Sequence, residues 1–171
     1  MIQRRVDNTV DFYKNWADYK SGFGDPTASF WIGLDEIHRI TSSCTATMDI
    51  EMTQDGVTKH AIYHGVRVAD ESDSYRLSYD IYDSSSTVRD SVDSGWKFST
   101  YDRDNDRHDG LDCAETRHAG WWFKQCSYSN LNGVMGPVPD DIDHTAYYFG
   151  MLGHSDQTKI PVDSCIIRFI F

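Results

Sequence analysis

One stretch, from Phe98 to Gly133, constrains this chain more than the rest of its sequence combined. It places three alternating carboxylates a few residues ahead of two cysteines: Asp102, Asp104, Asp106, Cys113 and Cys126. Short carboxylates on a turning backbone supply the hard oxygen ligands that calcium prefers. The stretch therefore predicts a cation loop beside a short disulfide-closed loop. Such an assembly suits an extracellular recognition site better than the active centre of an enzyme.

The carboxylate triplet resembles the first half of an EF-hand loop, but it lacks the glycine and the glutamate that complete one. A loop of another kind, completed by backbone carbonyls near His108 and Gly110, is the better interpretation. Acidic surface turns are also common without a cation, so the triplet alone is a weak signal. The neighbouring disulfide and aromatic residues strengthen the calcium prediction because they would hold the loop in a fixed shape.

The four cysteines indicate disulfides, because none forms a CxxC pair or has the spacing of a zinc site. A bridge between Cys113 and Cys126 is predicted, with two buried thiols as the alternative. Cys44 and Cys165 would pair with each other, or with a partner chain or another segment. Disulfides indicate an oxidising compartment and a secreted, extracellular protein. Met1–Arg5 is not followed by an apolar segment, so a fragment of a longer precursor is expected.

The charge balance disfavours two broad classes of partner. The chain has 16 basic and 27 acidic residues and a net charge of −11, which repels phosphate backbones and anionic membranes, so no nucleic-acid partner is expected. No run approaches the roughly 20 apolar residues of a membrane span, and no membrane insertion is expected. The sequence has no nucleophile elbow, zinc-protease helix or glycine-rich phosphate loop, so we predict that the chain is not an enzyme.

Local patterns predict short helices and several strands in one domain, residues 1–171. Phe12, Trp16 and Tyr19 have helical spacing, ended by Gly22. A second short helix is predicted over residues 35–40, capped by Asp35. Strands are predicted over residues 29–34, 45–52, 59–68, 75–82 and 164–171, with a hairpin turn at Gln54-Asp55-Gly56.

Taken together, these residues resemble the fibrinogen C-terminal domain, the module of ficolins, tachylectins, tenascins and angiopoietins. The resemblance covers most of the chain, weakens after Gly133, and rests on the segments Ile2–Asp7, Asp11–Trp16, Phe30–Asp35, Asp70–Leu77 and Phe98–Gly133. It implies an α+β fold with a central twisted antiparallel sheet and short helices. The sheet region would span residues 1–97, a long loop-rich, calcium- and ligand-binding region 98–163, and the final strand 164–171.

The resemblance also implies a set of calcium ligands. These would be the side chains of Asp104 and Asp106, with backbone oxygens from the stretch His108–Gly110. One residue more than in some relatives separates Asp106 from Cys113. The ion would act structurally and would not touch the bound ligand.

A ligand pocket beside the second cysteine is implied as well. The peptide bond Gln125–Cys126 would be cis, and the amides of Cys126 and Ser127 would point at an acetyl or carboxylate oxygen of the ligand. Ser127 stands where acetyl-binding lectins commonly have histidine. By the resemblance, the chain would begin midway through the domain, after the family's N-terminal subdomain and its disulfide.

Other pocket positions depart from the family too. Arg117, Ile142 and His154 fall near the aromatic funnel that grips an acetyl methyl group, and only Ile142 keeps an apolar wall. Asp143 retains one of two carboxylates that hold a peptide's amino terminus in fibrinogen. A guanidinium at Arg117 would repel that amine and favour a carboxylate, sulfate or sialic-acid-type group; a solvated loop residue is the alternative. His118 and other histidines nearby would make the pocket sensitive to pH.

The resulting hypothesis is a calcium-dependent recognition module that binds acetylated or anionic groups on glycans, in innate recognition of microbes. The alternative is a protein–protein interaction module of the tenascin or angiopoietin kind, acting in adhesion or receptor signalling. Trp121 and Trp122 would stack on a sugar in the first case, although adjacent aromatics in a disulfide loop are more often core. Homo-oligomerisation through segments outside this chain would add avidity.

Overall fold

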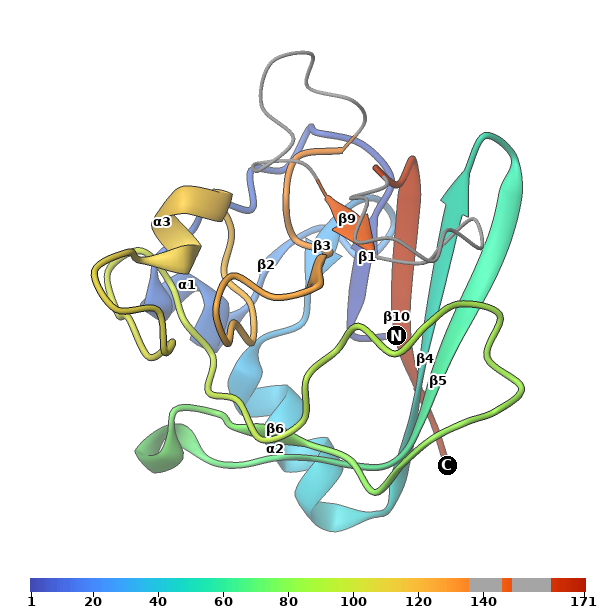
Figure 1. Ribbon diagram of the computed structural model, residues 1–171, viewed down its shortest axis with the longest axis horizontal. Coiled ribbons are helices and arrows are strands. Elements are labelled where there is room, and N and C mark those ends of the chain that lie inside the picture. Colours follow the sequence, from blue (N-terminus) through green and yellow to red (C-terminus); the bar gives the residue numbers. More distant parts are fainter. Residues whose placement is uncertain (136–145, 149–160) are drawn as a thin grey trace.

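The computed structural model describes residues 1–135, 146–148 and 161–171 and has an α+β fold (Figure 1). A twisted antiparallel sheet forms one side of the molecule, and loops with short helices form the other. The helical segments in the described residues are α1 (Trp16–Ser21), α2 (Leu34–Ser43), the 3-10 turn η1 (Glu71–Asp73) and α3 (Cys113–Arg117). No helix among them is long and apolar enough to cross a membrane.

The strands of the main sheet follow the order β2-β3-β1-β10-β4-β5-β6, with β7 also paired to β5. The last strand, β10, therefore lies inside the sheet, between β1 and β4. A separate short ladder joins β8 to β9. The bounds of the strands are β1 Gln3–Arg5, β2 Phe23–Gly24, β3 Phe30–Trp31, β4 Ala46–Gln54, β5 Val57–Val68, β6 Leu77–Ser78, β7 Ile81–Tyr82, β8 Ser129–Asn130, β9 Tyr147–Tyr148 and β10 Ser164–Ile170.

The longest pairing joins β4 to β5, as the alternation of apolar and polar residues predicted. Met48, Ile50 and Met52 of β4 point into the core and are buried. Asp55 and Gly56 connect the strands with φ angles of 49° and 74°. Positive φ at both residues is the mark of the two-residue type I′ turn, whose twist matches that of the strands. The predicted hairpin is therefore confirmed.

Two sequence predictions in this half of the chain were wrong in detail. Residues 75–82 form the two short strands β6 and β7, because their partner β5 bulges at Gly65, where φ is 69° and the register with β4 shifts. The N-cap of α2 is Gly33, not Asp35. Asp35 instead lies in the first turn and accepts a hydrogen bond from the Tyr75 hydroxyl.

Helix α1 begins later than the aromatic spacing suggested. Asn15 sets its start, because the Asn15 side chain accepts a hydrogen bond from the Asp18 amide at 2.9 Å. Phe12 thus precedes the helix, yet Phe12, Trp16 and Tyr19 are all buried. Gly22 follows the last helical residue, as predicted.

Aromatic side chains fill the core between the sheet and the loops. Phe98 contacts the rings of Trp16, Tyr19 and Trp122 at centroid distances of 6.3, 5.0 and 5.1 Å. Trp121 and Trp122 are 1% and 2% exposed. This burial confirms that the tryptophan pair belongs to the core and does not form a sugar-stacking surface.

Candidate functional site

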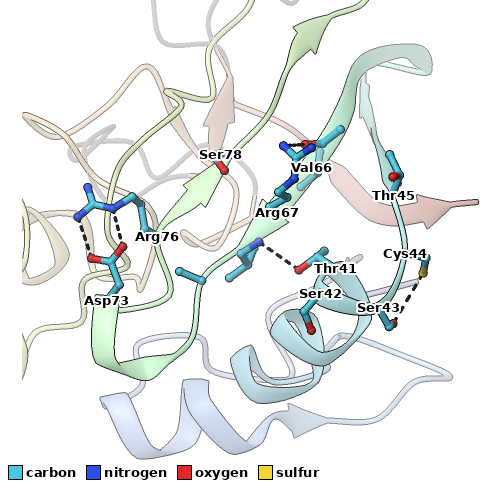
Figure 2. Close-up of a pocket in the computed structure, with 13 residues that line it drawn as sticks. Thr41, Ser42, Ser43, Cys44, Thr45, Val66, Arg67, Asp73, Arg76 and Ser78 are labelled. Atoms are coloured by element: carbon cyan, nitrogen blue, oxygen red, sulfur yellow. Dashed lines mark hydrogen bonds and ion pairs between the residues drawn. The ribbon is translucent and has the colours of Figure 1, made fainter.

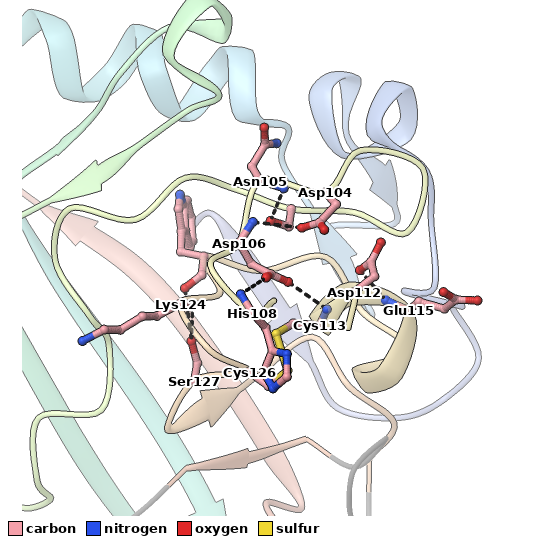
Figure 3. Close-up of a disulfide and its surroundings, with 12 residues drawn as sticks. Asp104, Asn105, Asp106, His108, Asp112, Cys113, Glu115, Lys124, Cys126 and Ser127 are labelled. Atoms are coloured by element: carbon pink, nitrogen blue, oxygen red, sulfur yellow. Dashed lines mark hydrogen bonds between the residues drawn. A yellow bond between two sulfur atoms is a disulfide. The ribbon is translucent and has the colours of Figure 1, made fainter. Parts of the chain in front are cut away.

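The acidic loop, residues 102–112, gathers three carboxylates beside the disulfide (Figure 3). One oxygen from each of Asp104, Asp106 and Asp112 lies within 4.8 Å of the other two. Asp104 and Asp106 were predicted as ligands, whereas Asp112 was not. Asp112 joins them because it is the N-cap of α3, and its carboxylate accepts the Glu115 amide at 3.0 Å.

Backbone amides hold these carboxylates in place. The two oxygens of Asp106 accept the amides of His108 at 2.7 Å and of Cys113 at 2.8 Å. Asp104 accepts the amide of Asp106 at 3.0 Å. Each carboxylate oxygen has a second lone pair, so these hydrogen bonds leave room for a cation. Gly110, with a φ of 85°, lies in the turn that follows; carbonyl ligation from His108 and Gly110 remains a prediction.

The electrostatics of the cluster favour a cation. Burial raises the pKa of Asp106, and the carboxylates of Asp104 and Asp112 add to the rise, while the two amide hydrogen bonds act against it. A bound divalent ion would offset this repulsion between carboxylates. The donors are all oxygens and no thiolate or imidazole takes part, so the set fits a hard ion such as Ca²⁺.

Asp102, the first acid of the alternating series, has a different role. Its Oδ1 accepts the backbone amide of Trp16 at 2.9 Å and the hydroxyl of Thr100 at 2.7 Å. The guanidinium of Arg103 lies 3.9 Å above the Trp16 ring and 3.5 Å from a carboxylate oxygen of Glu71. This end of the acidic loop is therefore fastened to α1 and η1 and is not part of the cluster.

The predicted disulfide between Cys113 and Cys126 is present, with Cα atoms 4.9 Å apart. The second pairing that we considered, Cys44 with Cys165, does not form: Cys44 is an exposed thiol and Cys165 a buried one. Cys165 lies opposite Met52 on β4, whereas Cys44 precedes the first residue of that strand. Eight residues separate Cys44 from Met52, or about 26 Å of extended chain, which is far beyond the reach of a bridge.

The expected cis bond is absent. Gln125–Cys126 is trans, like every other peptide bond among the described residues. Cys126 and Ser127 take left-handed backbone angles instead, with φ of 58° and 41°, and these make the tight turn. The Ser127 hydroxyl accepts the Lys124 amide at 3.2 Å and donates to the Trp122 carbonyl at 3.3 Å.

The residues predicted to contact a ligand are only partly brought together. Arg117 and His118 are half-buried at the end of α3, and Gln125 is exposed beside the disulfide. His118 stacks on Tyr13, with ring centroids 4.6 Å apart. Three predicted pocket residues lie outside the described residues: Ile142, Asp143 and His154.

A cavity of about 430 Å³ opens next to His118 and Tyr13. Arg5 lines it and is almost fully buried at 2% exposure. The Arg5 guanidinium donates to the Val10 carbonyl at 3.0 Å and lies 4.1 Å over the Phe12 ring. These contacts make Arg5 a support for the segment that leads into α1.

A larger cleft, of about 670 Å³, lies between the end of α2 and the β5–β6 pair (Figure 2). Its two arginines are already paired, Arg67 with Asp80 and Arg76 with Asp73, each at 2.8 Å. The Thr41 hydroxyl is likewise engaged with a helix carbonyl at 2.9 Å. Because these groups bind one another, the cleft is a weaker candidate than the acidic loop.

Solved structures define the class of this protein. The fibrinogen-like globe domain of human ANGPTL2 matches with a TM-score of 0.89 at 31% identity, over 99% of this chain and 78% of that one. A lamprey fibrin D-dimer complexed with the peptide ligand Gly-His-Arg-Pro-amide matches at 0.84 and 28% identity, over 98% and 59%. The fold is that of a fibrinogen-like globe.

The family model for the C-terminal globular domain of fibrinogen beta and gamma chains matches residues 1–146, and the chain belongs to this family. Angiopoietin-4 of Homo sapiens is 40% identical over 143 residues, covering 82% of this chain and 28% of that protein. Tenascin-N of Mus musculus is 38% identical over 138 residues, covering 80% and 9%. The chain thus spans less than a third of the length of these curated relatives.

Proposed function

We propose that this domain is an extracellular recognition module that binds a protein partner. The observation that carries the proposal is sequence similarity: an angiopoietin and a tenascin align with 82% and 80% of this chain. These relatives favour the protein-binding alternative over the glycan lectin that the sequence first indicated. The lamprey fibrin D-dimer adds that a fold of this kind can hold a peptide. The Cys113–Cys126 disulfide supports an oxidising, extracellular location.

We further infer that Ca²⁺ is held by Asp104, Asp106 and Asp112. The ion would supply positive charge that joins the acidic loop to the start of α3. Two contacts within the chain also hold this region together. The amide of Cys113 donates a hydrogen bond to Asp106, and the disulfide joins Cys113 to Cys126. In this arrangement calcium supports the shape of the recognition surface.

The proposal is tested by screening a multimeric form of the domain against a panel of purified cell-surface and matrix ectodomains, in calcium and in EDTA. Multimers raise avidity, so weak contacts become measurable. Binding to one ectodomain that falls in EDTA is the expected result. A parallel column of immobilised N-acetylglucosamine tests the glycan reading. Retention there that free acetylated sugar releases, together with no ectodomain bound, would replace the protein partner with a glycan.

A further inference from the structure

Two cationic side chains share one aromatic ring next to the disulfide. The Arg107 guanidinium and the Lys124 ammonium each lie 5.2 Å from the centroid of the Trp96 ring. The Arg107 amide also donates to the Lys124 carbonyl at 2.8 Å, so the acidic loop and the segment before Cys126 are joined here. The Lys124 side chain points away from the disulfide (Figure 3). We name these three residues, Trp96, Arg107 and Lys124, the Trp96 patch.

The two cations of the patch are not paired with a carboxylate, a property that Arg4 and Lys59 share among the described residues. Within the part of the chain that the structure describes, neither Arg107 nor Lys124 forms an ion pair. Several arginines elsewhere do pair, and they include Arg39 with Glu36, Arg67 with Asp80 and Arg76 with Asp73. In a chain with 27 acidic and 16 basic residues, two neighbouring cations without a carboxylate are unexpected.

Asp93 interacts electrostatically with Lys124 but forms no ion pair with it in the described part of the chain. The charge of Lys124 lowers the pKa of Asp93, but burial raises this pKa by more. The Asp93 Oδ2 atom is buried without a hydrogen-bond partner. Arg107 and Lys124 are both exposed and neither is paired with a carboxylate, so both can bind a carboxylate supplied from outside.

We propose that the Trp96 patch docks an acidic segment of the protein partner, and this inference rests on the proposed function. Arg107 would take one carboxylate in a bidentate contact, Lys124 would take a second, and Trp96 would receive an adjoining apolar side chain. Tryptophan and arginine are the residue types that most often dominate interface energetics. A short segment with a few carboxylates fits better than a long polyanion, because the net charge of −11 repels extended negative charge.

The test uses a fluorescent peptide of sequence Glu-Glu-Phe-Glu-Glu, with Lys-Lys-Phe-Lys-Lys as its matched control, followed by fluorescence anisotropy. The variant Arg107→Gln/Lys124→Gln should bind the acidic peptide about tenfold more weakly than the wild type. The variant Arg39→Gln/Lys59→Gln removes the same two charges elsewhere and should bind like the wild type. Equal affinities of the two double variants would overturn the proposal.

Two further arms keep the result decisive. The double variant could be less stable than the wild type, which a lower melting temperature would show. In that case the peptide affinity is measured for the single variant Lys124→Gln and for the wild type at high salt. Binding that neither change weakens also overturns the proposal. Heparin serves as a competitor, and tighter heparin binding that needs Arg107 and Lys124 would assign the patch to a sulfated glycan instead. Because the peptide is defined in advance, this outcome does not depend on whether the ectodomain screen finds a partner.

Discussion

The carboxylate of Asp106 accepts a hydrogen bond from the backbone amide of Cys113 at 2.8 Å. One side chain therefore belongs to the acidic cluster and also fixes the residue where the disulfide begins. The proposed cation site and the disulfide loop are joined at this contact. A change in the acidic cluster should therefore alter the disulfide loop, and a change in the disulfide loop should alter the acidic cluster.

The acidic series separates into two roles that mutation can distinguish. Asp106→Asn should weaken calcium binding about tenfold to hundredfold, because it removes a negative ligand from the cluster. Asp102→Asn should leave calcium affinity unchanged, since Asp102 binds the Trp16 amide. Isothermal titration calorimetry measures both affinities. Equal losses in the two variants would show that the ion binds elsewhere in the acidic loop.

The disulfide should carry a measurable share of stability. It closes a loop with a sequence separation of 13, and the chain-entropy model assigns such a loop about 3 kcal/mol. Cys113→Ser/Cys126→Ser should lower the free energy of unfolding by that order in urea titrations. Cys44→Ser is the matched control, because Cys44 is an exposed free thiol. A comparable loss in the control would mean that the loop is not the cause.

Acid should destabilise the fold in part through Asp83. The amide of Ser85 and then the His64 ring lower the pKa of Asp83 from 3.8 to about 2. The folded-state pKa is the lower one, so this stabilisation is fully present above about pH 4 and is lost as the pH falls toward 2. Melting temperatures between pH 5 and 2 should therefore fall less steeply for Asp83→Asn than for the wild type. Asp55→Asn, in the exposed β4–β5 turn, should follow the wild-type profile.

Gly120 should tolerate no side chain. A Cβ atom there would lie 2.5 Å from Cε2 of Tyr19, and the Tyr19 ring is fixed by its hydroxyl, which donates to the Phe12 carbonyl at 2.8 Å. Gly120→Ala should cost about 1–3 kcal/mol of unfolding free energy. In a Tyr19→Ala background the same substitution should add little, because the ring it meets is gone. Equal costs in both backgrounds would place the strain elsewhere.

Local chemistry explains the parts of the fold that the sequence predicted well. Asp55-Gly56 is a turn because those two residues accept positive φ, and the alternation in β4 and β5 follows from one buried face. Asp35 misled the prediction, since an acidic residue at the start of a helix looks like a cap. Only the tertiary structure shows that the Tyr75 hydroxyl binds Asp35 instead.

The candidate site shows the same division between local and long-range information. The spacing of Asp104 and Asp106 indicated the cluster, but Asp112 enters through the start of α3, which was not predicted. The sequence did hold a signal for this helix: aspartate is a favoured N-cap, and Asp112 stands directly before Cys113. Pairing of Cys44 with Cys165 could not be judged from spacing, since it depends on the register of β10 against β4.

The position of β10 bears on how the molecule is made. During synthesis the segments that form β1 and β4 leave the ribosome long before residues 164–170. Until β10 follows, each of these segments lacks the strand that pairs with one of its edges. Such open edges invite pairing with other nascent chains. A premature stop codon before β10 would make that exposure permanent, because β1 and β4 would lose the strand that lies between them and the sheet would be divided.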